Sequence, residues 1–344
     1  MSTQAKLQET GTVPPQIAYT QLLAGYWISQ GLYVAAKLRV AEHLRDGARN
    51  SEELAAACDA HAPSLYRLLR MLASCGVFAE DSEGRFSLTP LAEMLLEGAG
   101  AMHAMTLHLG ESPTWQAWGT LLDSVRTGET AFKLAHGKEV FPYYAEHPES
   151  NQPFNQAMTD YSGAVIAAVM SAYDFSAFGK IVDVGGCHGS LLTAILKANP
   201  QARGALFDLA PTVEGARARL EAEALLERCE LVGGDFFESI PDGGDAYIMK
   251  HIIHDWDEDR ALAILKNTHR AMKDDGRLLI IETVIPEGSE PTFSKLSDVH
   301  MMVMTGGRER TETEYRELFR KAGFELTRVV PTESMVSVVE GVKA

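Results

Sequence analysis

The stretch KIVDVGGCHGSLLTAILKANP, residues 180–200, decides the fold class. KIVDVGG predicts a strand that runs into a glycine turn, and SLLTAILKANP predicts a helix that Asn199 and Pro200 end. Glycine lets the chain turn sharply and lets a ligand approach the bare backbone. The spacing is not G-x-G-x-x-G, so the pyrophosphate of a dinucleotide is not favoured as that ligand. A plain strand-to-helix turn is the alternative.

Four more strands are predicted downstream, in ARGALFDLA, CELVGGDFF, GDAYIMKHI and GRLLIIETVI. Helical stretches separate several of them, notably DEDRALAILKNTHRAM. Strands that alternate with helices predict a parallel, doubly wound α/β sheet. We place this domain at residues 176–344.

Residues 17 to about 100 follow a different pattern, with consecutive helices and then a short hairpin around DSEG. SEELAAACDA is predicted to begin with a partial capping box, with Ser51 as N-cap and Leu54 at the third position. Three helices and a hairpin are typical of a winged-helix module, which we place at residues 1–100. Residues 101–175 are expected to form a helical bridge between the two domains.

Composition narrows the class of protein. The four cysteines are scattered without a C-x-x-C pair, which favours a reducing cytoplasm over a disulfide framework. No apolar run approaches the roughly 20 residues that span a bilayer, and the N-terminal MSTQAKLQETGTVPPQ does not resemble a signal peptide. The net charge of −16 disfavours nucleic acid as a partner.

Two acidic residues follow the next two predicted strands. Asp208 ends the second strand, where a carboxylate can accept hydrogen bonds from ribose hydroxyls, and Asp235 ends the third. Phe236 beside Asp235 is suited to pack on a base. Helix capping and turn formation are the alternatives for the two acids. Together with the loop at Gly185, these residues predict a site for an adenosine without a diphosphate.

DVGGCHG, FDLAPTV, GGDFF, MKHIIHDW and GGRERT, in this order, resemble the small-molecule O-methyltransferases of plant caffeic-acid type and their bacterial natural-product relatives. The resemblance covers nearly the whole chain. It implies a seven-stranded Rossmann-like domain, S-adenosylmethionine as methyl donor and a homodimer built through the N-terminal helices. Cys187 is a departure, because the family has a third consecutive glycine there.

KHIIHDW, residues 250–256, places His251 and His254 three residues apart. Residues three apart on a strand face opposite sides and no further ligand cluster is evident, so we predict no metal site. A neutral imidazole can take a proton from a phenol. By resemblance, His254 matches the catalytic base. Glu282 and Glu309 match its acids, one of them holding the far ring nitrogen; a surface acid and an arginine salt bridge are the respective alternatives.

The resemblance also implies binding residues. The cofactor positions extend to Leu209, beside Asp208, and to Lys250. The positions matched to an aromatic acceptor lie in PFNQAMTDYS and SDVHMMVMTGG: Phe154, Met158, Tyr161, Asp298, Met301 and Thr305. For the methionines a core position is the alternative, and for Asp298 a helix cap is the alternative.

Rival functions are a methyltransferase-like hydroxylase or decarboxylase, an N-methyltransferase, and a winged-helix DNA-binding regulator. Residues 1–100 contain eight Lys and Arg against eleven Asp and Glu. A DNA-binding domain should present a basic stripe instead, so the regulator is disfavoured. We predict transfer of a methyl group to a phenolic hydroxyl of a small aromatic natural product, in the cytoplasm and away from any membrane.

Overall fold

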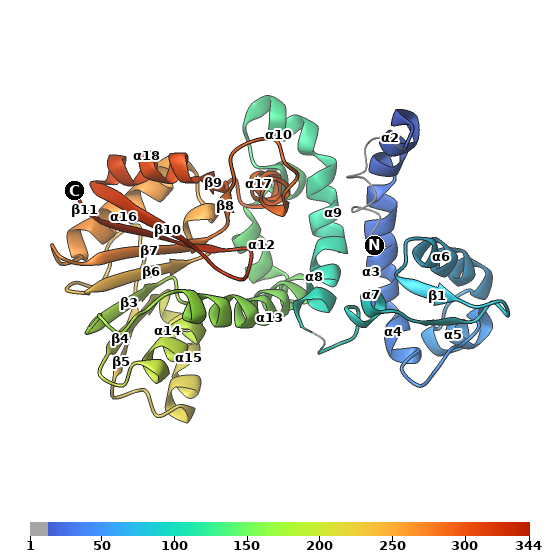
Figure 1. The fold of residues 1–344 in the computed structure, drawn as a ribbon, viewed down its shortest axis with the longest axis horizontal. Helices are drawn as coiled ribbons and strands as arrows, with labels where there is room; N and C mark the ends of the chain where they lie inside the picture. Colours follow the sequence, from blue (N-terminus) through green and yellow to red (C-terminus); the bar gives the residue numbers. More distant parts are fainter. Residues whose placement is uncertain (1–12, 99) are drawn as a thin grey trace. The chain divides into compact units, whose positions relative to one another are not determined.

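The computed structural model describes residues 13–98 and 100–344 of the chain (Figure 1). The chain folds into two compact units. One comprises the residues up to Gln116 together with Phe141–Tyr161, and the other comprises Ala117–Val140 together with Ser162–Ala344. The predicted bridge is shared between these units, and the predicted domain boundaries stay a prediction. Most of the stretch from which we predicted no signal peptide lies outside the described residues.

The described part of the first unit is helical apart from one hairpin. Its elements, three of which share residues with the second unit, are α2 (Pro15–Leu23), α3 (Gly25–Lys37), α4 (Val40–His43), α5 (Ser51–Cys58), α6 (Ala62–Ser74), β1 (Phe78–Glu80), β2 (Phe86–Leu88), α7 (Pro90–Glu93), α8 (Ala101–Gly110), α9 (Ser112–Gly119), α12 (Val140–Glu146) and α13 (Pro148–Ala172). Leu65, Leu69 and Leu72 recur at helical spacing on α6 and bury their side chains in the core of this unit, beside Phe78 and Phe86 of the hairpin. The predicted winged-helix-like domain is confirmed.

The start of α5 differs from the prediction. Asn50, not Ser51, is the N-cap: its side chain accepts a hydrogen bond from the backbone N–H of Glu53. The Glu53 carboxylate accepts the Asn50 N–H in return, so the capping box is complete. The assignment of Ser51 and Leu54 was therefore wrong by one residue.

The second unit contains a seven-stranded sheet with the order β10-β11-β7-β6-β3-β4-β5. Its strands are β3 (Lys180–Val184), β4 (Arg203–Asp208), β5 (Cys229–Gly233), β6 (Ala246–Lys250), β7 (Arg277–Glu282), β10 (Phe324–Pro331) and β11 (Ser337–Lys343). The other elements are α10 (Leu121–Thr127), α11 (Ala131–His136), α14 (Ser190–Ala198), α15 (Ala210–Ala222), η1 (Ile253–Asp255), α16 (Glu258–Ala271), β8 (Val284–Ile285), α17 (Phe293–Met304), β9 (Arg310–Thr311) and α18 (Glu312–Ala322). The predicted Rossmann-like fold is confirmed.

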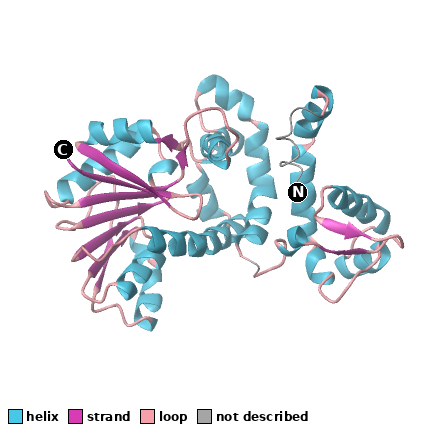
Figure 2. Cartoon of the chain, in the orientation of Figure 1, coloured by secondary structure: helices cyan, strands magenta, loops and turns pink. Residues whose placement is uncertain are grey.

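Helices cover both faces of this sheet (Figure 2). Val182 and Val184 of β3 point to one face and pack in a common core with residues of α16 and α18. On the other face, Gly204 of β4 lets Leu192 and Leu196 of α14 approach closely. The three central parallel strands β3, β6 and β7 are buried along almost their whole length, which is why their sequences are nearly continuous apolar runs.

The last two strands were not among the five strands located in the sequence. β11 pairs antiparallel with β7, and β10 pairs antiparallel with β11. The sheet is therefore mixed at this edge, where the prediction of a parallel sheet was wrong. No described helix combines the length and the apolar character needed to cross a bilayer.

Candidate active site

The chain makes a tight turn at the carboxyl end of β6. The chain passes from Lys250 through His251, whose φ is +55°, into η1. Asp257 then caps α16, where its side chain accepts the N–H of Arg260. His254 thus lies in the loop at the carboxyl end of β6, which is where ligands bind in open α/β sheets.

Glu282, the last residue of β7, holds this turn in place. Its side chain is 0% exposed, so the alternative of a surface acid is wrong. Oε1 accepts the backbone N–H groups of Ile252, Ile253 and His254 at 3.0, 2.6 and 3.1 Å. Oε2 accepts the hydroxyl of Tyr315 at 2.5 Å. Glu282 therefore fixes the backbone that carries His254 and does not contact the ring through a hydrogen bond.

Glu309 holds the imidazole itself. Its Oε1 lies 3.2 Å from Nδ1 of His254 and also accepts the hydroxyl of Ser297 at 2.8 Å. A carboxylate only accepts, so Nδ1 carries the proton and Nε2 is directed elsewhere. Arg308 forms its ion pair with Glu314, and Oε2 of Glu309 is buried without a hydrogen-bond partner among the described residues.

Three carboxylates set the charge of His254. Burial alone lowers the pKa of the imidazole, but Asp255, Glu309 and Glu282 outweigh it and raise this pKa to about 10. Oδ1 of Asp255 lies 3.8 Å from Nε2 of His254. Burial raises the pKa of Asp255 to about 6, although the imidazolium opposes that shift. At neutral pH His254 is therefore held as a cation between two acids.

His251 contradicts one premise of the metal argument. The strand ends before it, so the two histidines do not face opposite sides: their ring centroids are 5.2 Å apart. Burial and the charge of His254 hold the pKa of His251 well below its ordinary value. No group of three or more His, Cys, Asp or Glu side chains among the described residues is arranged to hold a metal ion. That no metal is used stays a prediction.

The glycine loop lies at the carboxyl end of β3. A Cβ on Gly185, whose φ is +69°, would come within 2.4 Å of Ile252, and one on Gly186 would come within 2.4 Å of Leu206. Neither glycine tolerates a side chain without movement of its neighbours. Cys187 adopts a φ of +52°, a conformation that glycine occupies at lower cost, so the family's third glycine has a physical reason here.

The predicted cofactor residues follow neighbouring strands. Asp208 ends β4 and accepts the N–H groups of Cys187 at 2.9 Å and of Leu209 at 2.7 Å, so it ties the glycine loop to the start of α15. Asp235 follows β5 and accepts the N–H of Phe237 at 2.8 Å. Phe236 packs edge-on against Trp256.

Lys250 and Asp183 are two ionisable groups close to the loop whose pKa values are shifted by burial. Nζ of Lys250 donates to the hydroxyl of Ser162 at 2.8 Å. Burial lowers the pKa of Lys250 more than Asp183 raises it. Burial likewise raises the pKa of Asp183 to about 7, and its Oδ2 has no partner in the described chain.

The residues predicted to bind the acceptor come from both units. Phe154, Met158 and Tyr161 lie on the part of α13 that belongs to the first unit, where Phe154 packs against Tyr144 with ring centroids 5.2 Å apart. Asp298, Met301 and Thr305 lie on or directly after α17 in the second unit. Asp298 does not cap its helix but accepts the N–H of Glu309 at 3.0 Å. Their assembly into one pocket stays a prediction.

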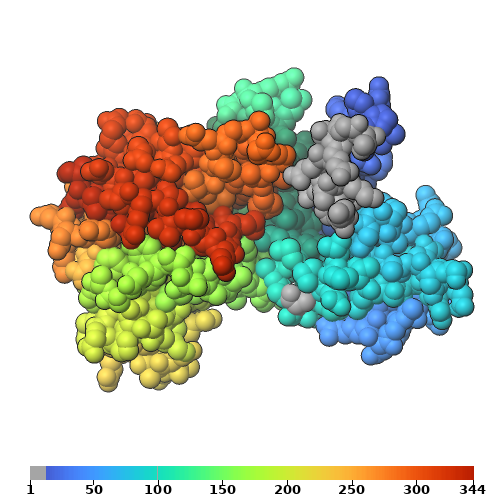
Figure 3. Space-filling view, in the orientation of Figure 1, coloured from blue at the N-terminus to red at the C-terminus, as the bar shows by residue number. Residues whose placement is uncertain are grey.

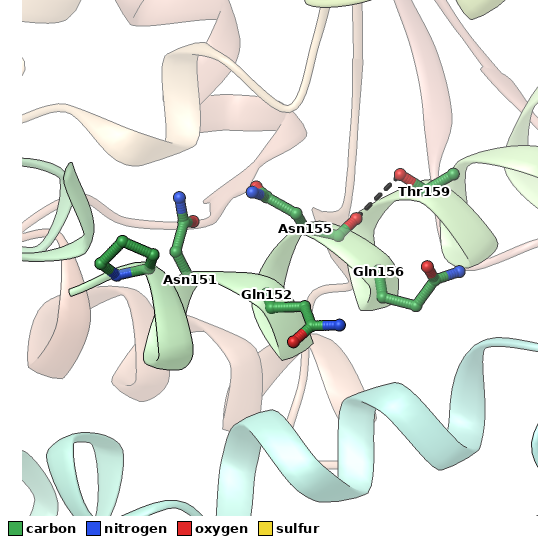
Figure 4. Close-up of a pocket in the computed structure, with 6 residues that line it drawn as sticks. Asn151, Gln152, Asn155, Gln156 and Thr159 are labelled. Carbon is green, nitrogen blue, oxygen red and sulfur yellow. Dashed lines mark hydrogen bonds between the residues drawn. The ribbon is translucent and has the colours of Figure 1, made fainter.

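One hollow of about 350 Å³ lies on α13 (Figure 4). It is lined by side-chain amides, a hydroxyl and a proline, from Pro148, Asn151, Gln152, Asn155, Gln156 and Thr159. None of the predicted site residues and no titratable group lines it.

Sequence reasoning missed three residues that position His254. Asp255 is the acid near Nε2, Ser297 bonds to Glu309, and Tyr315 bonds to Glu282. Asp255 had a signal, because it directly follows His254 in the sequence. Ser297 and Tyr315 had none, since only the fold brings α17 and α18 to this turn.

Comparison with known proteins identifies the family. An O-methyltransferase domain matches residues 118–325, and an O-methyltransferase dimerisation domain matches residues 20–98. A phenazine O-methyltransferase of Lysobacter antibioticus is 46% identical over 96% of this chain and 97% of its own. The mitomycin biosynthesis 6-O-methyltransferase of Streptomyces lavendulae is 41% identical over 90% and 89%.

The solved structure of a mitomycin 7-O-methyltransferase superposes with a TM-score of 0.88 at 38% identity, covering 99% of each chain. Proteins named as N-methyltransferases also match. The predicted resemblance is confirmed over the two domains and nearly the full length of the relatives. The chain belongs to the family of S-adenosylmethionine-dependent O-methyltransferases of bacterial natural-product biosynthesis.

Proposed function

We propose that this enzyme transfers the methyl group of S-adenosylmethionine to a phenolic hydroxyl of a small aromatic natural product, with His254 as general base. The observation that supports this most directly is the His254–Glu309 pair at the carboxyl end of β6. Glu309 occupies Nδ1 and leaves Nε2 for the proton of an acceptor hydroxyl. Incubation with S-adenosylmethionine and a panel of phenols, polyketide quinones and phenazines, analysed by mass spectrometry, tests the assignment. Absence of any methylated hydroxyl would contradict it.

The residues at the carboxyl ends of β3, β4 and β5 fit the family's cofactor. Gly185 and Gly186 let Ile252 and Leu206 pack directly against the loop, which fixes its backbone at the carboxyl end of β3, where ligands bind in open α/β sheets. Asp208 and Asp235, at neighbouring strand ends, offer carboxylates to a ribose and to a base, with Leu209, Phe236 and Lys250 beside them. Cofactor binding by these residues is our proposal. When bound, the cofactor supplies a methyl group on a positively charged sulfur.

The protein's own residues position the acceptor and accept the proton of its hydroxyl. A phenol has a pKa of about 10, close to that of His254 in this site. Transfer of the proton from the hydroxyl to Nε2 is therefore nearly balanced, and the nearby carboxylates stabilise the imidazolium that forms. Because the donor is already activated, positioning and exclusion of water are the larger tasks of the protein.

The protonation of His254 predicts how activity depends on pH. For the reaction, the acceptor oxygen and Nε2 of His254 must share a single proton. At neutral pH each of these two atoms carries its own proton, so one proton must first be lost. We expect kcat/KM to rise with pH, by about tenfold per unit well below the two pKa values, and to level near pH 10. A profile that is flat from pH 7 to 10 would contradict a cationic resting state of His254.

Asp255→Asn supplies the matched control for this profile. Asp255 is the strongest of the groups that raise the pKa of His254, and asparagine keeps its shape without its charge. Its loss should lower the pKa of His254, so the rise in kcat/KM should move to lower pH.

We also propose that the enzyme works as a homodimer. Tyr19, Leu22, Leu23, Tyr26 and Trp27 of α2 and α3 are each more than half exposed, and most of them fall within the dimerisation domain. The α2 segment is visible at the surface, in dark blue in Figure 3. An apolar cluster of this kind is typical of a protein–protein contact, and a second copy would cover it. Light scattering at micromolar concentration should give twice the mass of the chain; a monomer would contradict the proposal.

The methylated atom and the cellular location are also part of this proposal. We propose oxygen as the methylated atom because an imidazole base can take the proton of a hydroxyl. Nitrogen is the alternative, since N-methyltransferases are among the relatives. The same mass-spectrometric panel separates the two, and it also detects hydroxylated or decarboxylated products. The cytoplasm is the proposed location, because none of the four cysteines is paired in a disulfide.

A further inference from the structure

One face of α17 is directed at the His254–Glu309 pair. Ser297 of this helix donates to Glu309, which in turn holds His254. His300 and Met301 follow Ser297 by three and four residues, so they lie on the same face of the helix. The charge of His254 is also one cause of the lowered pKa of His300. His300 therefore lies on the face of α17 that Ser297 directs at the proposed base.

Trp118 fixes the tautomer of His300. Its Nε1 lies 3.3 Å from Nδ1 of His300, and the two ring planes are within 18° of each other. The centroids are 6.1 Å apart, and the hydrogen bond joins the edges of the two nearly parallel rings. An indole N–H can only donate, so Nδ1 of His300 must accept. A neutral imidazole then carries its proton on Nε2.

His300 keeps this form at neutral pH. Burial, and then the charge of His254, lowers the pKa of His300 to about 4, so the ring stays uncharged. The two histidines thus differ in state: His254 is a cation between acids, and His300 is a neutral donor. The hydrogen bond to Trp118 occupies Nδ1, and no acceptor for Nε2 is seen in the described ranges. α10 and α11 pack against α17, the helix that carries His300 (Figure 1).

We propose that the Nε2–H of His300 donates a hydrogen bond to a lone pair on the aromatic acceptor, a ring nitrogen or a carbonyl oxygen. His300 is then a specificity-determining residue, and Trp118 is the positioning residue that keeps its proton on Nε2. This inference rests on the proposed function, since it needs an aromatic acceptor beside His254. An acceptor that covers this half-buried N–H without bonding to it would leave a buried donor without a partner, so a ring system that lacks such a lone pair is disfavoured.

Three acceptors of the same outline test this assignment. 1-Hydroxyphenazine offers a ring nitrogen next to the hydroxyl, 1-hydroxyanthraquinone offers a carbonyl oxygen, and 1-hydroxyanthracene offers only C–H. Calorimetry in the presence of S-adenosylhomocysteine measures their affinities without methyl transfer. We expect the wild type to bind at least one of the first two about tenfold more tightly than the anthracene, the size of one neutral hydrogen bond. Which of them gains shows whether nitrogen or oxygen is recognised.

His300→Leu should remove this preference and leave the affinity for 1-hydroxyanthracene nearly unchanged. His300→Gln, whose amide can still donate, should keep part of it. Trp118→Phe should lose part of the preference, because the ring can then adopt either tautomer, and should have no further effect when combined with His300→Leu. An equal loss of affinity for all three acceptors in His300→Leu would indicate a structural role and overturn the proposal.

The tautomer gives a readout independent of the acceptor. Nitrogen-15 NMR of the histidine rings should identify a neutral ring protonated at Nε2 in the wild type and a mixture of tautomers in Trp118→Phe. A charged ring, or one protonated at Nδ1, would overturn the inference. Methylation of the three acceptors without any difference in affinity would uphold the proposed function while removing His300 from it. A wild type that neither binds nor methylates any of the three would overturn both.

Discussion

His254→Ala should lower kcat by about 10²–10⁴-fold, the usual contribution of a general base. The substitution removes the group that takes the acceptor's proton and leaves Glu309 and Asp255 without the imidazolium they stabilise. Affinity for S-adenosylmethionine should hardly change, because the proposed cofactor residues lie at the neighbouring strand ends. Steady-state kinetics and calorimetry on the same preparation measure the two effects.

His251→Ala is the matched control, since its ring lies 5.2 Å from that of His254. His251 has no proposed contact with the acceptor, so its loss should affect stability more than turnover. Raising the pH should partly rescue His254→Ala, because a phenol with a pKa of about 10 then ionises without a base. Equal losses in the two variants, or full activity in His254→Ala, would overturn the mechanism while leaving the family assignment in place.

The sequence predicted the parts of this fold that depend on neighbouring residues. The glycine loop, the strand before it and the helix after it lie within 21 residues, and each follows from local periodicity and turn chemistry. β10 and β11 were missed because charged residues interrupt their apolar pattern. Glu340 is buried on β11 only because Tyr173 and Arg328 bond to its carboxylate, and those contacts arise from distant segments.

The sequence predicted which residues belong to the site better than it predicted how they are arranged. Resemblance singled out His254, Glu282 and Glu309, and the structure places all three at one turn. The division of work between the two glutamates was not visible, because a glutamate after an apolar strand has the same local sequence whether it is buried or exposed. The positive φ of His251 likewise has no sequence signal, and it brings the two histidine rings together against the expectation from strand geometry.

Glu282→Ala should lower the stability of the enzyme by about 3–5 kcal/mol, the usual cost of removing one member of a buried charged network. Glu282 is 0% exposed, and its loss would leave three backbone N–H groups and the hydroxyl of Tyr315 without their acceptor. The turn that carries His254 would then lose its anchor. We therefore expect kcat to fall as well, although Glu282 forms no hydrogen bond with the ring of His254.

Two variants separate these effects. Glu282→Gln keeps an oxygen for the N–H groups of the turn, so it should retain most of the stability; it also removes a negative charge that raises the pKa of His254, so its kcat/KM profile should move to lower pH. Glu287→Ala removes an exposed glutamate from the loop that follows β8 and should change stability by no more than about 0.5 kcal/mol. Urea denaturation and pH profiles measure both quantities. Unchanged stability in Glu282→Ala would mean that the turn holds its shape without this carboxylate, and the positioning role of Glu282 would have to be abandoned.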